Sequence, residues 1–153
     1  MTLKQKRVLI TGITGQDGSF LAEYLLEKGI EVWGLHRRTS TPNVSNIHHL
    51  LELENMHLIE GDLTDLSSLI SIIHRVEPDC IYNLASQSFV PTSWTQPIFT
   101  VHATGLGALH VFEATRIVNP KIKIYQASSS EMFGSSNVRT QDENTPLCPN
   151  SPY

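Results

Sequence analysis

Short apolar runs alternate along this chain with amphipathic stretches of helical period. The apolar runs predict five β-strands, at residues 7–11, 31–36, 56–60, 80–84 and 121–127. Runs of this kind are typical of strands that are buried on both faces of a parallel sheet. Because crossover helices connect parallel strands, the pattern predicts an α/β fold with a doubly wound parallel sheet.

Three helices are predicted between these strands, each with an apolar stripe. The first begins after the glycine-rich segment 12–18 and ends at Gly29; its stripe is Phe20, Leu21, Tyr24 and Leu25. The second is capped by Thr64 or Asp65 and broken by Pro78; its stripe is Leu66, Leu69, Ile70 and Ile73. The third is stopped by Asn119; the residues on or near its stripe are Val101, Leu106, Leu109, Phe112, Glu113 and Ile117. We expect the polar segment 128–153 to be a loop.

Length and composition limit the class of protein. The 153 residues amount to about one domain, and residues 1–153 are expected to be an incomplete one, since Ser151-Pro152-Tyr153 closes no strand or helix. A hydrophobic content of 40% with a net charge of −4 excludes intrinsic disorder and argues against a nucleic-acid surface. No apolar run approaches the roughly 18 residues of a membrane span. Cys80 and Cys148 are too few for a disulfide framework, so we expect a cytoplasmic protein.

Glycines follow the first predicted strand at positions 12, 15 and 18. Gly12 permits a tight turn, Gly15 lets a phosphate approach the backbone, and Gly18 lets the helix pack on the strand. The free N–H groups of the helix N-terminus attract a pyrophosphate. The loop therefore predicts a Rossmann-like NAD(P)-binding domain, with a plain structural turn as the alternative. Its candidate cofactor-binding residues are Gly12, Ile13, Thr14, Gly15, Gln16, Asp17 and Gly18.

The second strand ends in an unusual pair of arginines. An NAD site places an acidic residue there for the ribose 2′-hydroxyl, but residues 32–51 contain no Asp or Glu. Arginine and hydroxyl side chains are instead suited to a 2′-phosphate. The sequence therefore predicts NADP as cofactor, unless the arginines are only solvated surface charge. The residues concerned are Arg37, Arg38, Thr39 and Ser40.

The third and fourth strands also end in candidate cofactor residues. Asp62 suits a hydrogen bond from the adenine amine, with Leu63 packed on the ring, although a helix cap is the alternative for Asp62. After the fourth strand, small residues would let a cofactor lie against the backbone; ordinary packing is the alternative. This second group is Leu84, Ala85, Ser86, Gln87 and Ser88.

Hydroxyl and carboxylate groups follow the fifth strand. Ser129 and Glu131 lie where a parallel sheet presents catalytic groups, so they predict proton transfer. Tyr153 has an ordinary pKa near 10 and needs a nearby cation to act as a base at neutral pH. The chain has no residue 157, and position alone favours a structural role for Tyr153 over a catalytic one.

Together these segments resemble sugar-nucleotide dehydratases of the extended short-chain dehydrogenase/reductase superfamily, and among them the GDP-mannose 4,6-dehydratase family. The likeness covers the whole chain without a large gap. Ser130 and the arginine pair separate the chain from the dTDP-glucose 4,6-dehydratases, and the carboxylate of Glu131 from epimerases and reductases. The matching segments are 11–18, 37–40, 61–64, 82–88, 125–134 and 141–146.

The resemblance implies a redox-neutral lyase that dehydrates GDP-mannose with bound NADP. Tyr153 would take the proton of the hexose 4-hydroxyl as hydride leaves C4, and Ser129 would hydrogen-bond that hydroxyl. Glu131 would take the C5 proton and assist loss of the 6-hydroxyl as water. The product would be GDP-4-keto-6-deoxy-mannose. The family's Tyr-x-x-x-Lys motif begins at Tyr153 and its lysine lies outside the sequence, so this chain alone is expected to be inactive.

The resemblance also adds Phe99 to the NADP site, at a position where relatives usually have Tyr, and puts Ser129 where they usually have Thr. Relatives form dimers or tetramers through surface helices, so a homodimer or homotetramer is expected. The small domain that grips the GDP-sugar is expected to lie beyond this chain. No metal centre is expected, because the adjacent His48 and His49 would not share a helix face. The alternatives are an epimerase or 4-reductase of the same superfamily, or a non-catalytic NADP-binding module.

Overall fold

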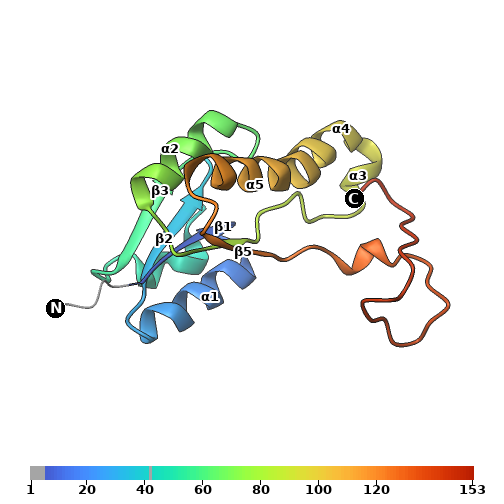
Figure 1. The fold of residues 1–153 in the computed structure, drawn as a ribbon, viewed down its shortest axis with the longest axis horizontal. Coiled ribbons are helices and arrows are strands. Elements are labelled where there is room, and N and C mark those ends of the chain that lie inside the picture. The colour runs from blue at the N-terminus through green and yellow to red at the C-terminus, as the bar shows by residue number, and fades with distance from the viewer. Residues whose placement is uncertain (1–5, 42) are drawn as a thin grey trace.

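The strands assemble into one parallel sheet. A computed structural model of the chain describes residues 6–41 and 43–153 (Figure 1). The strand order is β3-β2-β1-β4-β5, which confirms the predicted doubly wound α/β fold. The predicted fourth and fifth strands are each longer than the observed ones. The strands are β1 (Arg7–Thr11), β2 (Glu31–His36), β3 (Met56–Glu60), β4 (Cys80–Asn83) and β5 (Lys123–Gln126).

Helices cover the sheet from two sides (Figure 1). On one side lie α1 (Gln16–Glu27) and the 3₁₀-helix η1 (Ser45–Leu50). On the other lie α2 (Leu66–Val76) and α5 (Gly107–Val118). Three consecutive segments lead into α5, namely α3 (Thr92–Thr95), α4 (Pro97–Thr100) and the π-helix η2 (Val101–Leu106). The segment after β5 is a loop, as predicted, apart from the 3₁₀ turn η3 (Ser130–Met132).

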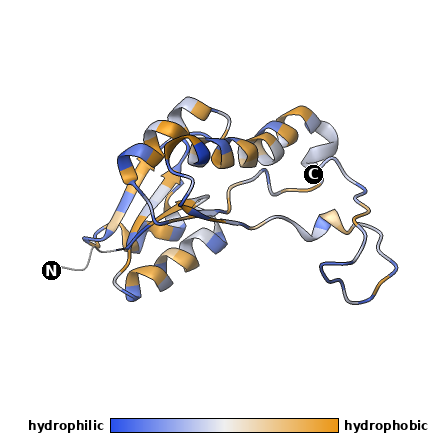
Figure 2. Ribbon diagram, viewed as in Figure 1, coloured by the Kyte–Doolittle hydropathy of each residue, from blue (hydrophilic) through white to orange (hydrophobic). Residues whose placement is uncertain are grey.

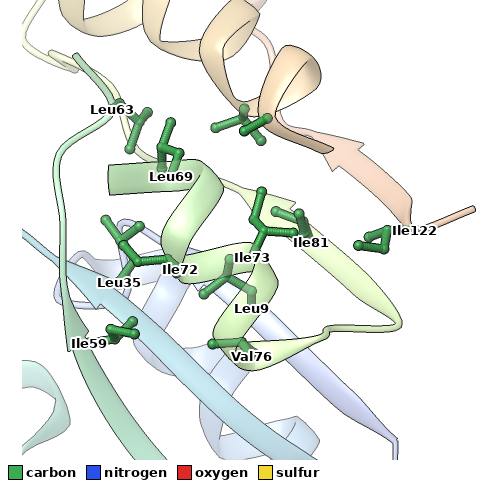
Figure 3. Close-up of a cluster of buried hydrophobic side chains, with 12 residues drawn as sticks. Leu9, Leu35, Ile59, Leu63, Leu69, Ile72, Ile73, Val76, Ile81 and Ile122 are labelled. Atoms are coloured by element: carbon green, nitrogen blue, oxygen red, sulfur yellow. The ribbon is translucent and has the colours of Figure 1, made fainter. Parts of the chain in front are cut away.

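Two apolar clusters hold these layers together. Figure 3 shows the cluster between the sheet and α2, where Leu9 and Ile81 of the strands meet Ile73 of the helix. The second cluster packs Ile10 and Val32 of the sheet against Ala22 of α1. The sheet is therefore buried from both sides around β1.

The apolar stripe of α5 faces away from the core. The helix buries Gly107, Val111, Ala114 and Thr115, while Leu109 and Phe112 are 56% and 40% exposed. Small residues occupy the buried face because the helix packs closely on its neighbours. A Cβ on Gly107, for example, would lie 3.0 Å from the Cβ of Leu63. Hydrophobic segments run along α5 in Figure 2, and the larger of these side chains face outward.

The stripe of α1 is only partly as predicted. Leu25 is buried and Leu21 packs against the core, but Phe20 and Tyr24 are 59% and 57% exposed. Ser19 and Ala22 take the inner positions instead.

Helix termini follow the sequence signals. Asp65, one of the two predicted caps, accepts hydrogen bonds from the backbone N–H groups of Ser67 and Ser68 at 3.0 and 3.3 Å. A hydrogen bond from the Ser67 hydroxyl, together with those from the two N–H groups, holds the pKa of Asp65 below its ordinary value. Gly29 follows α1 with φ +72°, the left-handed conformation of a C-terminal glycine. Within the described residues, no helix is long and apolar enough to cross a membrane.

Candidate functional site

The strand order reverses between β1 and β4, and a cavity opens there. Parallel sheets bind ligands beyond the carboxyl ends of the strands at such a reversal. The cavity has a volume of about 850 Å³ and is lined by the segments that follow β1, β2, β3 and β4, together with α4 and η2. This size suits an extended cofactor.

The glycine loop forms one wall of the cavity. Gly12 has φ +72°, and a Cβ there would lie 2.9 Å from the backbone nitrogen of Ala85. The Gly15 N–H donates to the Gly12 carbonyl at 3.0 Å and closes the turn. Gly18 is buried against Gly12 and Ile13, as expected for close packing of helix on strand. The loop thus brings its backbone to the cavity at the N-terminus of α1.

The structure brings most of the predicted cofactor residues into this cavity. Those that line it are Gly12, Thr14, Gly15, Arg37, Asp62, Leu63, Leu84, Ala85, Ser86, Gln87, Ser88 and Phe99. The cavity lining does not include Ile13, Gln16, Asp17, Gly18, Arg38, Thr39 or Ser40. Ile13 is fully buried in the core, whereas Arg38, Thr39 and Ser40 are exposed.

The two arginines differ in position. Arg37 lines the cavity, beside His36 at the end of β2, and Arg38 does not. The Arg37 carbonyl lies 3.3 Å from the Nδ1 atom of His36. Arg37 is therefore the guanidinium group available to an anion in the cavity.

Asp62 turns the chain between β3 and α2. One of its carboxylate oxygens accepts from both the N–H and the hydroxyl of Thr64, each at 2.8 Å. The N-cap of α2 is Asp65 instead, so the helix-cap alternative for Asp62 is wrong. Asp62 therefore lines the cavity wall while one of its oxygens is bound to Thr64.

The segment after β4 is held by hydrogen bonds on both sides. The Thr11 hydroxyl accepts from the backbone N–H groups of Leu84 and Ala85 at 3.2 and 3.1 Å. The side-chain amide of Gln87 makes hydrogen bonds within the protein. Its oxygen accepts from the Phe89 N–H at 2.6 Å, and its nitrogen donates to the Thr100 hydroxyl at 3.2 Å. Gln87 therefore shapes the cavity wall through its side-chain bonds to α4 and the loop.

The predicted catalytic residues are not part of the cavity lining. The Ser129 hydroxyl accepts a hydrogen bond from the Glu131 N–H at 3.1 Å, and Glu131 is exposed. Tyr153, at the end marked C in Figure 1, is half-buried. Ser129, Glu131 and Tyr153 are all absent from the cavity lining. Ser129 and Glu131 are neighbours in one turn, and among the described residues no hydrogen bond joins either of them to Tyr153.

Sequence reasoning missed part of the cavity wall. Leu35 and His36 are the last residues of β2 and could have been found by the strand-end rule used for the arginines. Ile98, His102 and Ala103 come from α4 and η2, and nothing in the sequence pattern marked the π-helix that presents two of them. The lining residues outside the prediction are Leu35, His36, Asn43, Thr64, Ile98, His102 and Ala103.

A family model described as GDP-mannose 4,6 dehydratase matches residues 9–153. The chain belongs to the GDP-mannose 4,6-dehydratase family. It is 48% identical over 155 residues to a GDP-mannose 4,6-dehydratase of Yersinia enterocolitica, covering 97% of this chain and 42% of the relative. It is 47% identical over 154 residues to the human GDP-mannose 4,6 dehydratase, covering 95% and 41%.

Solved structures agree on the fold of this dehydratase-family chain. A UDP-Glc/GlcNAc 4-epimerase from Campylobacter jejuni superposes with a TM-score of 0.87 at 22% identity, covering 97% of this chain and 44% of that one. The Bordetella bronchiseptica enzyme WbmH, solved in complex with NAD⁺, superposes with a TM-score of 0.80 at 26% identity, covering 97% and 48%. The chain spans about two fifths of the length of the curated relatives it matches.

Proposed function

We propose that the protein containing this chain is a GDP-mannose 4,6-dehydratase. It converts GDP-mannose to GDP-4-keto-6-deoxy-mannose by internal hydride transfer through NADP and loss of water. The observation that carries the proposal is the cavity of about 850 Å³ at the strand ends, in a chain of this family.

The residues of the cavity fit NADP. Gly12 and Gly15 present no side chains of their own to the space where a pyrophosphate would bind at a helix N-terminus. Arg37 supplies the cation for a 2′-phosphate, and residues 32–51 hold no acidic residue that would prefer a free ribose hydroxyl. When bound, the nicotinamide accepts a hydride and returns it. The residues proposed to hold the group are the cavity-lining glycines, Arg37, Asp62, Leu63, 84–88 and Phe99.

The catalytic part of the proposal assigns three roles. Ser129 donates its hydroxyl proton to the sugar 4-oxygen, since its own oxygen already accepts from the Glu131 N–H. Tyr153 takes the proton from the 4-hydroxyl. Glu131 takes the C5 proton, which a C4 ketone makes acidic, and gives it to the departing 6-hydroxyl. Exposure of the Glu131 carboxylate suits a group that must reach a substrate.

Mass spectrometry on the full-length protein tests this function. The protein is incubated with GDP-mannose without added reductant, and Glu131→Gln is the matched variant. We expect a product lighter by one water, no net consumption of NADPH, and no product from Glu131→Gln. An isomer of unchanged mass would instead indicate an epimerase, and NADPH consumption a reductase. Cofactor binding without turnover would indicate a binding module.

We include a homodimer or homotetramer in the proposal. The outer side of α5 carries apolar side chains that a monomer would leave in water, with Leu109 56% and Ile117 49% exposed. Exposed apolar side chains gathered on one side of a helix are typical of protein–protein contacts. The proposed contact face consists of Leu106, Leu109, Phe112 and Ile117.

We also propose a cytoplasmic location. Cys80 and Cys148 are both free thiols, which suits a reducing compartment. Cell fractionation with antibody detection tests this, and recovery in a secreted fraction would contradict it.

A further inference from the structure

A row of three polar side chains crosses the sheet at its carboxyl edge. Thr11 of β1 stands beside Asn83 of β4, and Asn83 stands beside Gln126 of β5 in the strand register. Thr11 and Asn83 are 0% and 1% exposed, so the row begins in the core. Gln126 is half-buried at the outer end.

Hydrogen bonds run the length of this row. The Thr11 hydroxyl donates to Asn83 Oδ1 at 2.5 Å, and Asn83 Nδ2 donates to Gln126 Oε1 at 2.7 Å. The Thr11 oxygen in turn accepts from the N–H groups of Leu84 and Ala85. Buried polar groups linked in this way fix one geometry, because an unpaired buried amide is costly.

The two ends of the row belong to different parts of the proposed site. Thr11 directly precedes Gly12, and Ala85 lies against Gly12 on the cavity wall. At the other end Gln126 is followed by Ala127, whose N–H donates to the Asn83 carbonyl at 3.2 Å. Ser128 then turns the chain with φ +59°, and Ser129 and Glu131 follow.

We propose that Gln126 is a positioning residue that aligns the Ser129–Glu131 turn with the cofactor cavity. Strand pairing of β4 and β5 ends at Gln126. Beyond Ala127 the described turn is held by its own local bonds and by one distant bond, from the Cys148 N–H to the Met132 carbonyl at 3.0 Å. The side-chain bond from Asn83 to Gln126 is therefore the last cross-strand restraint from a side chain before the catalytic turn. This bond is connected to the cavity wall through Asn83 and Thr11. Loss of the bond should therefore affect the turn more than the glycine loop. This inference rests on the proposed dehydratase function.

Three variants of Gln126 isolate this bond. Gln126→Met keeps the side-chain length and removes the acceptor. Gln126→Asn keeps the amide but draws it back by one methylene, and serves if the Met variant fails to fold. Gln126→Glu keeps an oxygen that can accept from Asn83. Lys123→Met is the control, because Lys123 is exposed on the same strand.

The kinetic experiment uses the full-length protein. The turnover number for water loss from GDP-mannose is measured per mole of bound NADP, together with the Kd of NADP. We expect Gln126→Met and Gln126→Asn to lower the turnover number roughly fivefold to tenfold, the effect of one lost hydrogen bond. The Kd of NADP should stay within about twofold of wild type, and Gln126→Glu should restore most of the turnover. An unchanged turnover per bound NADP in the Met and Asn variants, or a Glu variant as slow as they are, would overturn the proposal.

Amide hydrogen exchange separates this inference from the proposed function. In Gln126→Met, the amides of residues 127–131 should exchange roughly fivefold to tenfold faster while those of 12–18 keep their rates. If wild type releases no water from GDP-mannose, the proposed function fails, and exchange alone then decides whether Gln126 positions the turn. Equal exchange in wild type and Gln126→Met would reject the positioning role even in an active enzyme.

Discussion

The hydroxyl oxygen of Ser129 accepts a hydrogen bond from the backbone N–H of Glu131 at 3.1 Å. This bond caps the N-terminus of the turn η3. It also keeps close together the two residues that are proposed to act on neighbouring carbons of one sugar. A hydroxyl that accepts in this way still has its own proton to donate. The same bond therefore fixes the turn and points to a donor role for Ser129.

Replacing Ser129 tests this double role. We expect Ser129→Ala to lower the turnover number on the order of tenfold to a hundredfold, because the turn loses a bond and the substrate loses a donor. Ser129→Thr keeps the hydroxyl and should remain within a few-fold of wild type. Steady-state kinetics on the full-length protein gives both values. An alanine variant as fast as wild type would remove Ser129 from the mechanism.

Arg37 is predicted to determine the preference for NADP. Arg37 lines the cavity and Arg38 does not, so the two make a matched pair. We expect Arg37→Ala to raise the Kd of NADP roughly tenfold or more and to change the Kd of NAD little, since only NADP carries the 2′-phosphate. Arg38→Ala should have a much smaller effect. Isothermal titration with both cofactors provides the comparison, and equal losses in the two variants would contradict the assignment.

Gly12 and Gly29 offer a second matched pair, because both have φ +72°. A Cβ on Gly29 meets nothing within 4 Å, whereas one on Gly12 would lie 2.9 Å from the Ala85 nitrogen. We expect Gly29→Ala to cost about 1 kcal/mol of unfolding free energy, the cost of the left-handed conformation alone. Gly12→Ala should cost clearly more and weaken NADP binding. Urea unfolding and cofactor titration measure both effects, and equal costs would show that close approach to Ala85 is unimportant.

Sequence pattern predicted the strands well because burial on both faces leaves a local signature. The run 7–11 matches β1 residue for residue, and Gly29 ends α1 as expected. The glycine spacing likewise identified the loop that forms the cavity wall. It did so because a Cβ at these glycines would lie too close to neighbouring backbone atoms.

Helix faces were harder to predict because packing distance decides them. On α5 the buried face contains Gly107 and Ala114, which let the helix pack closely on its neighbours, and the larger Leu109 and Phe112 are exposed. Hydrophobicity alone ranks these residues in the opposite order. The π-helix that brings His102 to the cavity depends on how α4 continues into α5, which no local residue pattern reveals.

The exposed face of α5 predicts self-association. Leu109→Glu places a charge at the centre of the proposed contact face, where Leu109 is 56% exposed. We expect wild type to elute as a dimer or larger and the variant as a smaller species, because an unpaired charge in an apolar contact is costly. Light scattering after size exclusion gives the mass. Tyr24→Glu, at an exposed position on the opposite side of the sheet, is the control. A variant of unchanged mass would exclude this face as the contact.

Glu31 is predicted to make stability depend on pH. Burial acts to raise the pKa of Glu31, but hydrogen bonds from Trp33 and Arg7 and the charge of Arg7 outweigh it and hold the pKa below its ordinary value of 4.5. The side chain is 17% exposed, and its oxygens lie 2.8 Å from Trp33 Nε1 and 3.1 Å from Arg7 Nε. When the pKa of a carboxyl group is lower in the folded protein than in the unfolded chain, the group stabilises the fold at every pH above the unfolded-state pKa. That stabilisation is lost as the pH falls through the folded-state pKa. The stabilisation is therefore complete at neutral pH and is lost in the acid range below about 4.5.

Urea unfolding of wild type and Glu31→Gln at a series of pH values tests this sign. We expect wild type to be the more stable protein at neutral pH, and the difference in unfolding free energy to shrink once the pH falls below about 4.5. Glu52→Gln, at an exposed position, is the control and should show little difference from wild type at neutral pH. A difference between wild type and Glu31→Gln that stays constant into the acid range would mean that the ionised form of Glu31 gains nothing from Arg7 and Trp33. The bond between β1 and β2 would then act through packing of the Arg7 side chain and not through charge.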